Sequence, residues 1–479
     1  MFEFCPYTTN DGSVGLFSPS DDDIYHSFYG AVTEAFEKFI MPACIPEFIL
    51  NNDGIRVLDI CYGIGYNTKT FLNFILNLKS KNFLKNYLEY KNKLSVYNDK
   101  IYTDNLITDK YNEPLYSDKI SENDIQTNCD EQIYTNNIFK KYSADFLHDA
   151  IRKKLNLKNF SIKISSVEIE KDLVLISPFI KDKLSKSKNE KIENEKIKKF
   201  LKFTQNPKNA SMTDFNEDII NLYSNLIYES IKLKPAVSTF LLDNILHIND
   251  KISDYKDIIH ILNDIRYYGY FSPDIRRYFI DYINQTLNNT PRTDLNALLH
   301  NIYYNHISNS HKMALNTLKS LNIDFRINID DARQVLQSDD NVYDFVFLDA
   351  FTPAKVPCLW TYDFLKLIYN HLSDNGLLIT YSSAAPVRNA LINIGYFVGE
   401  NFNPLKNKSL GTIASKNKSL IKYPLSEFNL GLLNSKAGIN YRDENLNALN
   451  DEILTRRNLD VKNSNLMSTS KYKKLHKLP

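Results

Sequence analysis

The chain has little cysteine, and its cysteines follow no pattern that binds metal. Its 479 residues include five cysteines, with no Cys-x-x-Cys pair and no histidine cluster to complete a ligand set. Zinc sites and disulfide frameworks both depend on such regular groupings. We therefore expect neither a metal site nor a disulfide framework in this protein.

Long apolar runs are also missing. No stretch approaches about 18 consecutive apolar residues, the length that crosses a bilayer as a helix. The first residues lack the basic region and the apolar run of a secretory signal peptide. The sequence thus predicts a cytoplasmic protein with no membrane-spanning segment.

Neither sign of charge dominates the chain. It carries 58 Lys and Arg against 57 Asp and Glu, for a formal net charge of +1. This balance argues against a strongly basic surface that would bind any polyanion. A nucleic acid would have to be held by local groups of lysines. One candidate group is Lys406, Lys408, Lys416, Lys418 and Lys422, and another, equally suited to a solvated tail, is Lys471, Lys473, Lys474 and Lys477.

Residues 342–360 hold the most informative motif that is present. Phe345 to Leu348 form an apolar run typical of a buried parallel strand, and Asp349 follows directly. In open α/β sheets, ligands bind beyond the carboxyl ends of such strands, so Asp349 stands where a catalytic group is expected. An aspartate in this place can also simply cap the next turn. This segment alone leaves both interpretations open.

A second strand and turn lie upstream, at residues 55–67. The apolar strand reaches Asp59, and Gly63 and Gly65 follow in a turn that leads into an expected helix. Glycine lets the backbone turn sharply and approach a ligand closely. A dinucleotide site would instead show G-x-G-x-x-G with an acid about 20 residues later, and no such fingerprint occurs here. The segment resembles the acid-x-Gly-x-Gly-x-Gly opening of class I S-adenosylmethionine methyltransferases, with Cys61 at the first glycine.

Further motifs follow the order found in one family. The chain resembles the bacterial tRNA 5-aminomethyluridine methyltransferases, which comprise the methyltransferase half of the bifunctional MnmC protein and its stand-alone relatives. The similarity covers roughly residues 1–80, 158–180 and 320–470. The segments that carry it are 9–13, 25–35, 58–67, 167–172, 330–333, 348–360, 377–391, 408–415, 437–443 and 452–457.

The resemblance implies an α/β fold of the class I S-adenosylmethionine-dependent methyltransferases: a Rossmann-like, mostly parallel sheet with large, partly helical insertions. It also implies a division of the chain. Residues 1–80 would form an N-terminal lid and the first half of the methyltransferase domain, 158–180 its second strand region, and 317–430 its second half. The other parts would be insertions at 81–157 and 181–316 and a C-terminal tail at 431–479.

The first insertion and the start of the second are polar. Residues 92–137 are rich in Asn, Asp, Tyr and Ser, which predicts weakly ordered loops. Mixed charges dominate 181–199 and predict a solvated helix or linker.

The rest of the second insertion is patterned. Apolar residues at helical spacing in 218–231, 240–248 and 258–265 predict a small helical cap on the main domain. Aromatic and basic residues alternate over 266–278, which favours packing within helices; stacking on tRNA bases is the alternative.

The resemblance further implies the residues that bind S-adenosyl-L-methionine. Glu170, at the end of the second strand, would accept hydrogen bonds from the two ribose hydroxyls. Glu168 is the weaker candidate, because strand alternation points it to the opposite face. Asp331, followed by Ala332, would accept a hydrogen bond from the exocyclic amine of adenine. The remaining predicted cofactor residues are Asp59, Gly63, Gly65 and Asn67.

The acceptor in this family is a primary amine on the wobble uridine of tRNA. Alkyl amines have a pKa of about 10, and the ammonium form has no lone pair to attack a methyl group. The site must therefore bind the neutral amine or remove its proton. Asp349 is predicted to orient that amine, Phe351, with Pro353 and Trp360, to wall the base, and His26 to relay a proton or to hold structure. The predicted catalytic set is Asp349, Phe351, Lys355 and His26.

Two other classes of function remain. A Rossmann enzyme acting on a small amine, such as an aminopropyltransferase, also presents an aspartate after its fourth strand, but its paired acids are absent because Phe351-Thr-Pro-Ala follows. A degenerate cofactor-binding or interaction protein would fit Cys61, yet Asp59 and Glu170 together with the later aspartates argue against it. Because the chain has no dinucleotide fingerprint, a separate enzyme is expected to supply the aminomethyl substrate.

Overall fold

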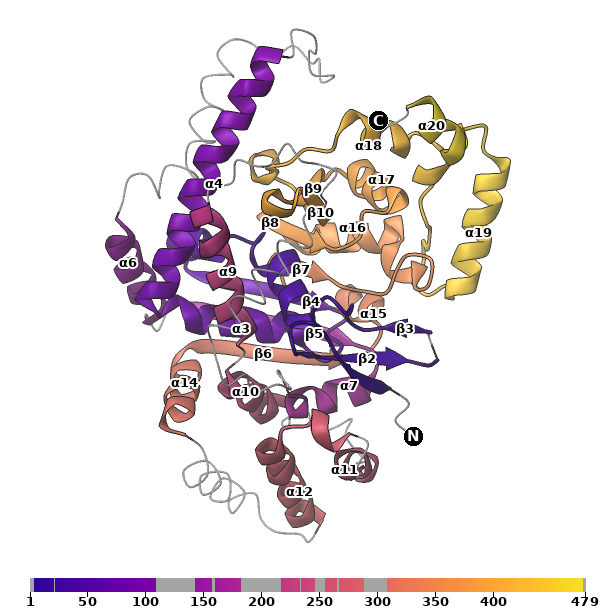
Figure 1. Cartoon of the computed structure of the whole chain (residues 1–479). Helices are drawn as coiled ribbons and strands as arrows, with labels where there is room; N and C mark the ends of the chain where they lie inside the picture. Colours follow the sequence, from indigo (N-terminus) through magenta and orange to yellow (C-terminus); the bar gives the residue numbers. More distant parts are fainter. Residues whose placement is uncertain are drawn as a thin grey trace.

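A seven-stranded sheet forms the centre of the molecule (Figure 1). The computed structural model describes residues 4–20, 22–108, 143–156, 160–181, 217–232, 234–245, 255–264, 267–287 and 308–476. The strand order is β6-β5-β4-β7-β8-β10-β9, and the neighbouring strands are parallel except around β10, which runs antiparallel to both β8 and β9. The predicted class I methyltransferase fold is thereby confirmed. The strands are β4 (Gly54–Ile60), β5 (Ser161–Glu168), β6 (Asn322–Ile329), β7 (Tyr343–Leu348), β8 (Leu372–Thr380), β9 (Phe397–Asn403) and β10 (Lys408–Ser415).

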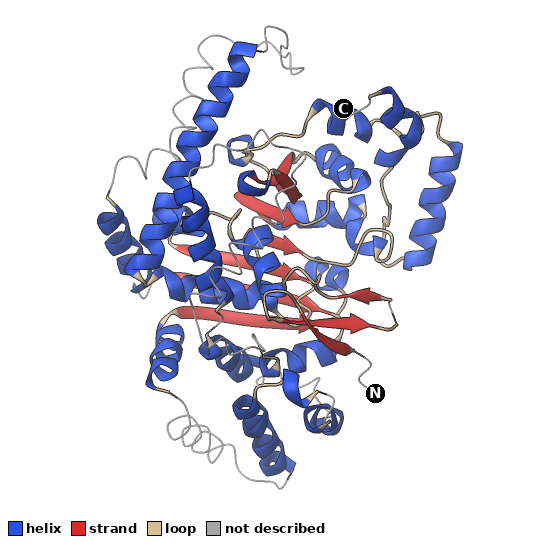
Figure 2. Cartoon of the chain, viewed as in Figure 1, coloured by secondary structure: helices blue, strands red, loops and turns tan. Residues whose placement is uncertain are grey.

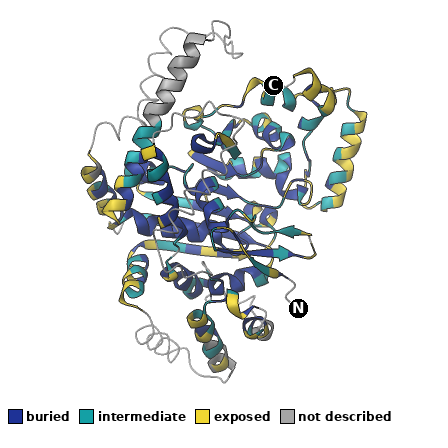
Figure 3. Ribbon diagram, viewed as in Figure 1, coloured by how far each residue is buried: buried dark blue, intermediate teal, exposed yellow. Residues whose placement is uncertain are grey.

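Helices cover both faces of this sheet (Figure 2). Every residue of β7 is buried, as its continuous apolar sequence predicts for a strand covered on two sides. Phe345 and Phe347 pack into one core, and Val346 and Leu348 into the other. The middle of the sheet has the colour of buried residues in Figure 3. The first core includes α1 (Ala31–Ala35), the π-helix η1 (Phe36–Ile40), α2 (Ile45–Asn51) and α3 (Tyr66–Leu78); the second includes α15 (Ala332–Gln337), α16 (Tyr362–His371) and α17 (Ala385–Ile394).

The first insertion contains helices where loops were predicted. The long helix α4 (Lys81–Thr108) and the helix α6 (Ala144–Asn156) flank residues 109–142, which lie outside the described part of the chain. The prediction of loops is therefore wrong for residues 92–108. Leu84, Tyr87 and Leu88 form an apolar face on α4 that is almost fully buried, and this packing outweighs the weak helix propensity of the Asn and Tyr residues that follow.

The second insertion is helical, as predicted, but it is not peripheral. Its described helices are packed into the main core, where Leu226 and Leu241 are fully buried. The charged run at 182–199 and Arg266 lie outside the described residues. Tyr267, Phe271 and Tyr278 are buried and pack within the fold, whereas Tyr268 is exposed. The helices are α9 (Glu217–Ile231), α10 (Pro235–Ile245), α11 (Tyr255–Asn263), α12 (Pro273–Leu287) and α14 (Asn309–Ser320).

A small antiparallel sheet near the N-terminus leads into a segment that covers the strand ends. It consists of β1 (Cys5–Thr8), β2 (Val14–Ser18) and β3 (Asp23–Ile24). Tyr25, directly after β3, packs against Phe351 beyond β7, with their ring centroids 5.0 Å apart.

The C-terminal segments pack beside α16 and α17 (Figure 1). None of the described helices is long and apolar enough to cross a membrane. The remaining helical elements are α7 (Lys171–Ile176), η2 (Ser177–Phe179), η4 (Tyr268–Tyr270), η5 (Pro357–Trp360), η6 (Pro404–Lys406), η7 (Lys418–Leu420), α18 (Glu427–Leu433), η8 (Lys436–Gly438), α19 (Asn450–Asn463) and α20 (Thr469–Leu475).

A buried ion pair ties the second insertion to the main domain. Lys406, predicted as a surface contact for nucleic acid, is instead buried, with its Nζ 2.6 Å from both carboxylate oxygens of Glu37 on η1. Tyr29 also contacts this pair, and the hydroxyl of Tyr223 on α9 donates to Glu37 Oε1 at 2.8 Å. Asn403 donates to the Tyr223 hydroxyl at 2.9 Å, so α9 also contacts the segment that carries Lys406. Burial lowers the pKa of Lys406, and its contacts with Glu37 oppose that shift.

Replacing Lys406 by alanine should lower the free energy of unfolding by about 3 kcal/mol or more, because it leaves the buried Glu37 charge without its cation. Lys408→Ala is the matched control: this lysine is exposed, and its loss should change stability by less than about 0.5 kcal/mol. Urea unfolding of both variants measures the difference. Equal, small effects would show that Glu37 does not depend on Lys406.

Candidate functional site

A cavity of about 490 Å³ lies at the carboxyl ends of β4, β5 and β7. Its walls come from the turn after β4, the ends of β5 and β6, the loop after β7, residues 23–27 with the helix that follows, and Asn450 of α19. This is where ligands bind in open α/β sheets. Among the described residues, no group of three His, Cys, Asp or Glu side chains is arranged to hold a metal ion.

The turn after β4 is held in left-handed backbone conformations. Cys61, Gly63 and Gly65 have φ angles of 66°, 54° and 81°. Gly63 lines the cavity, as predicted. Gly65 does not: a Cβ there would lie 2.4 Å from the ring of Tyr62, so this glycine is needed for packing beneath the turn. Cys61 adopts a conformation that favours glycine, at the position where the resembled motif has one.

Asp59 also lies behind the cavity wall and not on it. It is fully buried in β4 and accepts a hydrogen bond of 2.6 Å from the hydroxyl of Thr68 on α3. Burial raises its pKa to about 7, and the charge of nearby Asp349 contributes to the shift. Asp59 therefore supports the turn from beneath. Its side chain does not reach the cavity.

Asp349 lies on the cavity wall immediately after β7. Its backbone N–H donates to the carbonyl of Ile60, and Asn67 Nδ2 donates to its Oδ2 at 3.0 Å. Burial raises its pKa to about 6, whereas nearby Lys38 and the hydrogen bond from Asn67 lower it. The carboxylate is thus fixed in place, faces the cavity, and is mainly ionised at neutral pH.

Asn67 meets a further requirement for a ligand site. Its amide oxygen is buried and has no hydrogen-bond partner among the described residues, although the residue lines the cavity. A buried acceptor without a donor costs free energy, and a bound amine or hydroxyl would remove that cost. Asn67 thus lies at the cavity, and its role in binding stays a prediction.

Two glutamates close the end of the cavity at β5. Glu168 is buried and accepts backbone N–H groups from Gly63 at 2.7 Å, Ile169 at 2.9 Å and Glu170 at 3.0 Å. Glu170 is exposed and lines the same cavity. The expectation that Glu168 points to the opposite face is wrong, because residues i and i+2 of a strand share a face, and both glutamates line the cavity. Glu168 holds the glycine turn in place, and Glu170 lies at the rim of the cavity.

The acid predicted to meet adenine is held by a neighbouring arginine. Asp331 caps α15 and accepts hydrogen bonds from the Arg333 backbone and guanidinium, the shortest being 2.7 Å. Asp331, Ala332 and Arg333 all line the cavity.

The predicted catalytic residues are only partly brought together. His26 and Phe351 line the cavity, but Lys355 does not: it donates to the carbonyl of Asp22 at 2.8 Å and pairs with Asp23 at 3.1 Å, fastening the loop after β7 to the N-terminal segment. Trp360 is fully buried and donates to the carbonyl of Phe351, so it supports that residue from behind.

His26 is neutral at physiological pH. Burial lowers its pKa to about 4, and its ring packs edge-on against Tyr66 with centroids 5.0 Å apart. A group that is protonated only near pH 4 is a poor proton acceptor at neutral pH, which favours the structural role over the proton relay.

Several lining residues were not predicted from the sequence. Glu34 and Lys38 form an ion pair of 3.0 Å along α1 and η1, and both line the cavity near Asp349. Their i, i+4 spacing was the available signal. Tyr381, after β8, lies beneath Lys38 and donates to the carbonyl of Ala350 at 2.7 Å.

Asp349→Asn should stabilise the protein at pH 8 by roughly 1–3 kcal/mol and give no gain near pH 4. The folded-state pKa of about 6 exceeds the ordinary 3.8, so the carboxyl contributes stability below 3.8 that is lost as the pH rises through 6. Asparagine removes the buried charge that costs free energy above that pH. Thermal unfolding at both pH values measures the effect, with exposed Asp374→Asn as the control. A gain that is independent of pH would contradict the raised pKa.

Part of the chain is similar in sequence to known proteins. Residues 293–417 match the family model described as S-adenosyl-L-methionine-dependent methyltransferase. An uncharacterized protein of Methanocaldococcus jannaschii is 39% identical over 127 residues, which are 26% of this chain and 35% of that relative. The match thus spans about a third of the relative's length.

A solved structure titled as MNMC2 from Aquifex aeolicus is also similar. It aligns over 96% of this chain and 84% of its own length at 18% identity, with a TM-score of 0.46. Residues 293–417 are thus similar to the S-adenosyl-L-methionine-dependent methyltransferases, for which S-adenosyl-L-methionine is the expected cofactor, and the strand order agrees with the predicted fold.

Proposed function

We propose that this protein methylates the amine of 5-aminomethyl(-2-thio)uridine at the wobble position of tRNA, giving the 5-methylaminomethyl nucleoside. The observation that carries the proposal is Asp349, a fixed carboxylate on a cavity that also contains the glycine turn and residues 23–27. The sequence motifs that resemble the aminomethyluridine methyltransferases supply these same three parts of the wall.

The charge of the cavity suits cationic ligands. Its lining includes seven carboxylates (Asp23, Glu34, Glu168, Glu170, Asp330, Asp331 and Asp349) and two cationic side chains (Lys38 and Arg333). S-adenosyl-L-methionine supplies an activated methyl group on a positively charged sulfur. An excess of carboxylates favours such a cation and an amine, and it repels phosphate, so contacts with the tRNA backbone must lie outside the cavity.

Asp349 has the protonation state that the reaction requires. The acceptor amine is mostly an ammonium in water and must lose a proton before its lone pair can attack. A carboxylate with a pKa of about 6 is ionised at neutral pH, accepts a hydrogen bond from the amine, and holds its nitrogen in a fixed direction. Positioning of the neutral amine is therefore the role we assign to Asp349.

Tyr25 and Phe351 offer faces for the nucleobase. Both rings line the cavity and lie 5.0 Å apart, one from the N-terminal segment and one from the loop after β7. Aromatic rings stack on bases with little sequence preference. The exposed Lys408 and Lys422, and Lys471 to Lys474 on α20, are candidates for phosphate contacts; Lys406 is buried and Lys477 lies outside the described residues.

The test of function is mass spectrometry of tRNA nucleosides. The protein should add one methyl group to the wobble aminomethyluridine of tRNA from cells that lack this methylation, using S-adenosyl-L-methionine, after a separate enzyme has supplied the aminomethyl group. Methylation of spermidine in place of tRNA would instead identify a small-amine methyltransferase, to which the acidic cavity is also suited.

Asp349→Asn should lower the rate of this methylation by about 10²-fold or more while changing cofactor affinity little. Asparagine keeps the side-chain shape but accepts a hydrogen bond less strongly. Raising the pH supplies neutral amine from solution, so the defect should shrink between pH 7 and pH 9. Single-turnover rates over this range measure both effects. If the variant is as fast as the wild-type protein at pH 7, Asp349 does not take part in the reaction.

Glu170→Gln and Glu168→Gln should separate binding from support of the glycine turn. Glu170→Gln is expected to weaken cofactor affinity by roughly 1.5–3 kcal/mol without loss of stability, the range for a hydrogen bond to a charged group. Glu168→Gln should reduce both, because three backbone N–H groups depend on that carboxylate. Calorimetry and thermal unfolding measure the two quantities. Unchanged cofactor affinity in Glu170→Gln would indicate that Glu168, and not Glu170, binds the ribose.

A further inference from the structure

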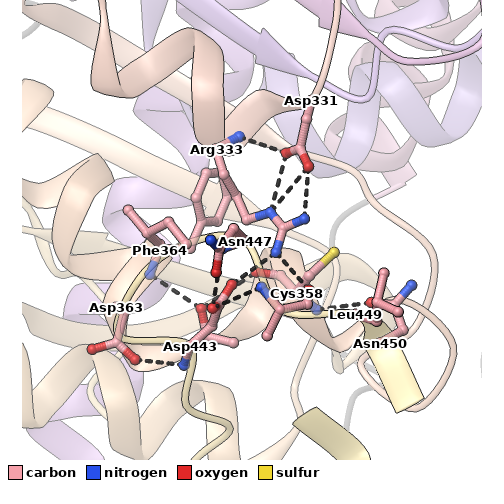
Figure 4. Close-up of polar contacts among 12 residues, drawn as sticks. Asp331, Arg333, Cys358, Asp363, Phe364, Asp443, Asn447, Leu449 and Asn450 are labelled. Carbon is pink, nitrogen blue, oxygen red and sulfur yellow. Dashed lines mark hydrogen bonds and ion pairs between the residues drawn. The ribbon is translucent and has the colours of Figure 1, made fainter. Parts of the chain in front are cut away.

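A buried arginine links the cofactor cavity to the C-terminal part of the chain (Figure 4). On one side, Arg333 Nη2 donates to Asp331 Oδ2 at 2.7 Å and Nε donates to both oxygens at 3.1 Å. On the other side, Arg333 Nη1 donates to Asp443 Oδ2 at 2.7 Å and to the carbonyl of Ala448 at 2.9 Å. Arg333 is 8% exposed, so these contacts are largely shielded from water.

Asp443 in turn organises the loop before α19. It is 2% exposed, and its Oδ1 accepts backbone N–H groups from Asn447 at 3.2 Å and Ala448 at 3.1 Å. Its own N–H donates to Asp363 on α16 at 2.7 Å. The loop then delivers Asn450, which lines the cavity and accepts the backbone N–H of Cys358 at 3.2 Å (Figure 4). The C-terminal segment is thus a wall of the cavity.

This arrangement fixes the direction and the chemistry of Asp331. Both of its carboxylate oxygens accept hydrogen bonds from Arg333, and a bidentate arginine holds a carboxylate in one orientation. An ionised carboxylate accepts hydrogen bonds and donates none. The lone pairs that remain can meet a donor such as an amine, and they repel a carbonyl oxygen.

We propose that Arg333 is a positioning residue, anchored by Asp443, which aims Asp331 at the exocyclic amine of the bound adenine. The Asp331–Arg333–Asp443 chain then makes the site prefer a 6-amino purine to a 6-oxo purine. This inference rests on the proposed placement of the adenine at Asp331, and it assigns to residues 443–450 a part in cofactor selection.

The test compares binding of S-adenosylhomocysteine and of its 6-oxo counterpart, S-inosylhomocysteine, by calorimetry. Wild-type protein should bind the 6-amino compound at least 10-fold more tightly. Arg333→Gln should reduce that ratio to less than about 3-fold, because Asp331 is released to turn. Arg333→Lys, which keeps the charge but not the fork, should give an intermediate ratio.

Two further variants separate positioning from folding. Asp443→Asn should lower the ratio in the same direction as Arg333→Gln, with wild-type contacts inside the cavity otherwise left unchanged. Arg442→Gln is the matched control: this neighbouring arginine pairs with Asp363 at 3.0 Å and Glu444 at 3.5 Å and is not among the residues that line the cavity, so the ratio should stay at the wild-type value.

Several outcomes would overturn the inference. An unchanged ratio in Arg333→Gln or in Asp443→Asn, with a fall only in thermal stability, would show that the Asp331–Arg333–Asp443 contacts stabilise the fold and do not select the base. A ratio lowered equally in Arg442→Gln would mean that any loosening of the loop is sufficient. Wild-type protein that binds both compounds equally would remove Asp331 from base selection, whereas failure to bind either compound would contradict the proposed cofactor site itself.

Discussion

The parallel pairing of β4 with β7 is the constraint on which the site depends. Its register places Ile60 opposite Leu348, so the glycine turn and Asp349 emerge side by side from neighbouring strands. The hydrogen bond from Asn67 to Asp349 then joins two residues that are 282 positions apart in the sequence. Cavity walls contributed by β5 and by residues 23–27 are added to this pair. A shift of β7 by one residue would turn the carboxylate to the other face of the sheet, and Asp349 would no longer lie beside the glycine turn.

The described helices of the insertions contribute to the core, whereas the cavity is lined by residues outside 181–316. The described helices α9 and α10 bury apolar side chains against α3 and η1, and Tyr223 reaches the Glu37–Lys406 pair. No described residue between 181 and 316 lines the cavity. Connections after α3 and η2 can therefore lengthen without touching the ligand, provided that the added apolar faces find partners.

Local patterns predicted what depends on neighbouring residues. The strand before Asp349, the turn at Gly63 and the helical spacing of α9 are each readable within about 15 residues. Contacts between distant segments were not readable: Arg333 with Asp443, Lys406 with Glu37, and the Lys355 link to the N-terminal segment. The misplacement of Trp360 has the same origin, since an aromatic residue near a site can face the ligand or support the loop from behind. Only tertiary packing decides between them.

The separation of β4 from β7 along the chain has a consequence for synthesis. At about 5–20 residues per second, a ribosome needs roughly 15–60 s to make the stretch between Asn67 and Asp349. During that time the backbone N–H and C=O groups on the edge of β4 that will pair with β7 have no native partner. Competing strands or chaperones can reach this edge, so the nascent chain is most vulnerable to mispairing at the strand that later carries the glycine turn.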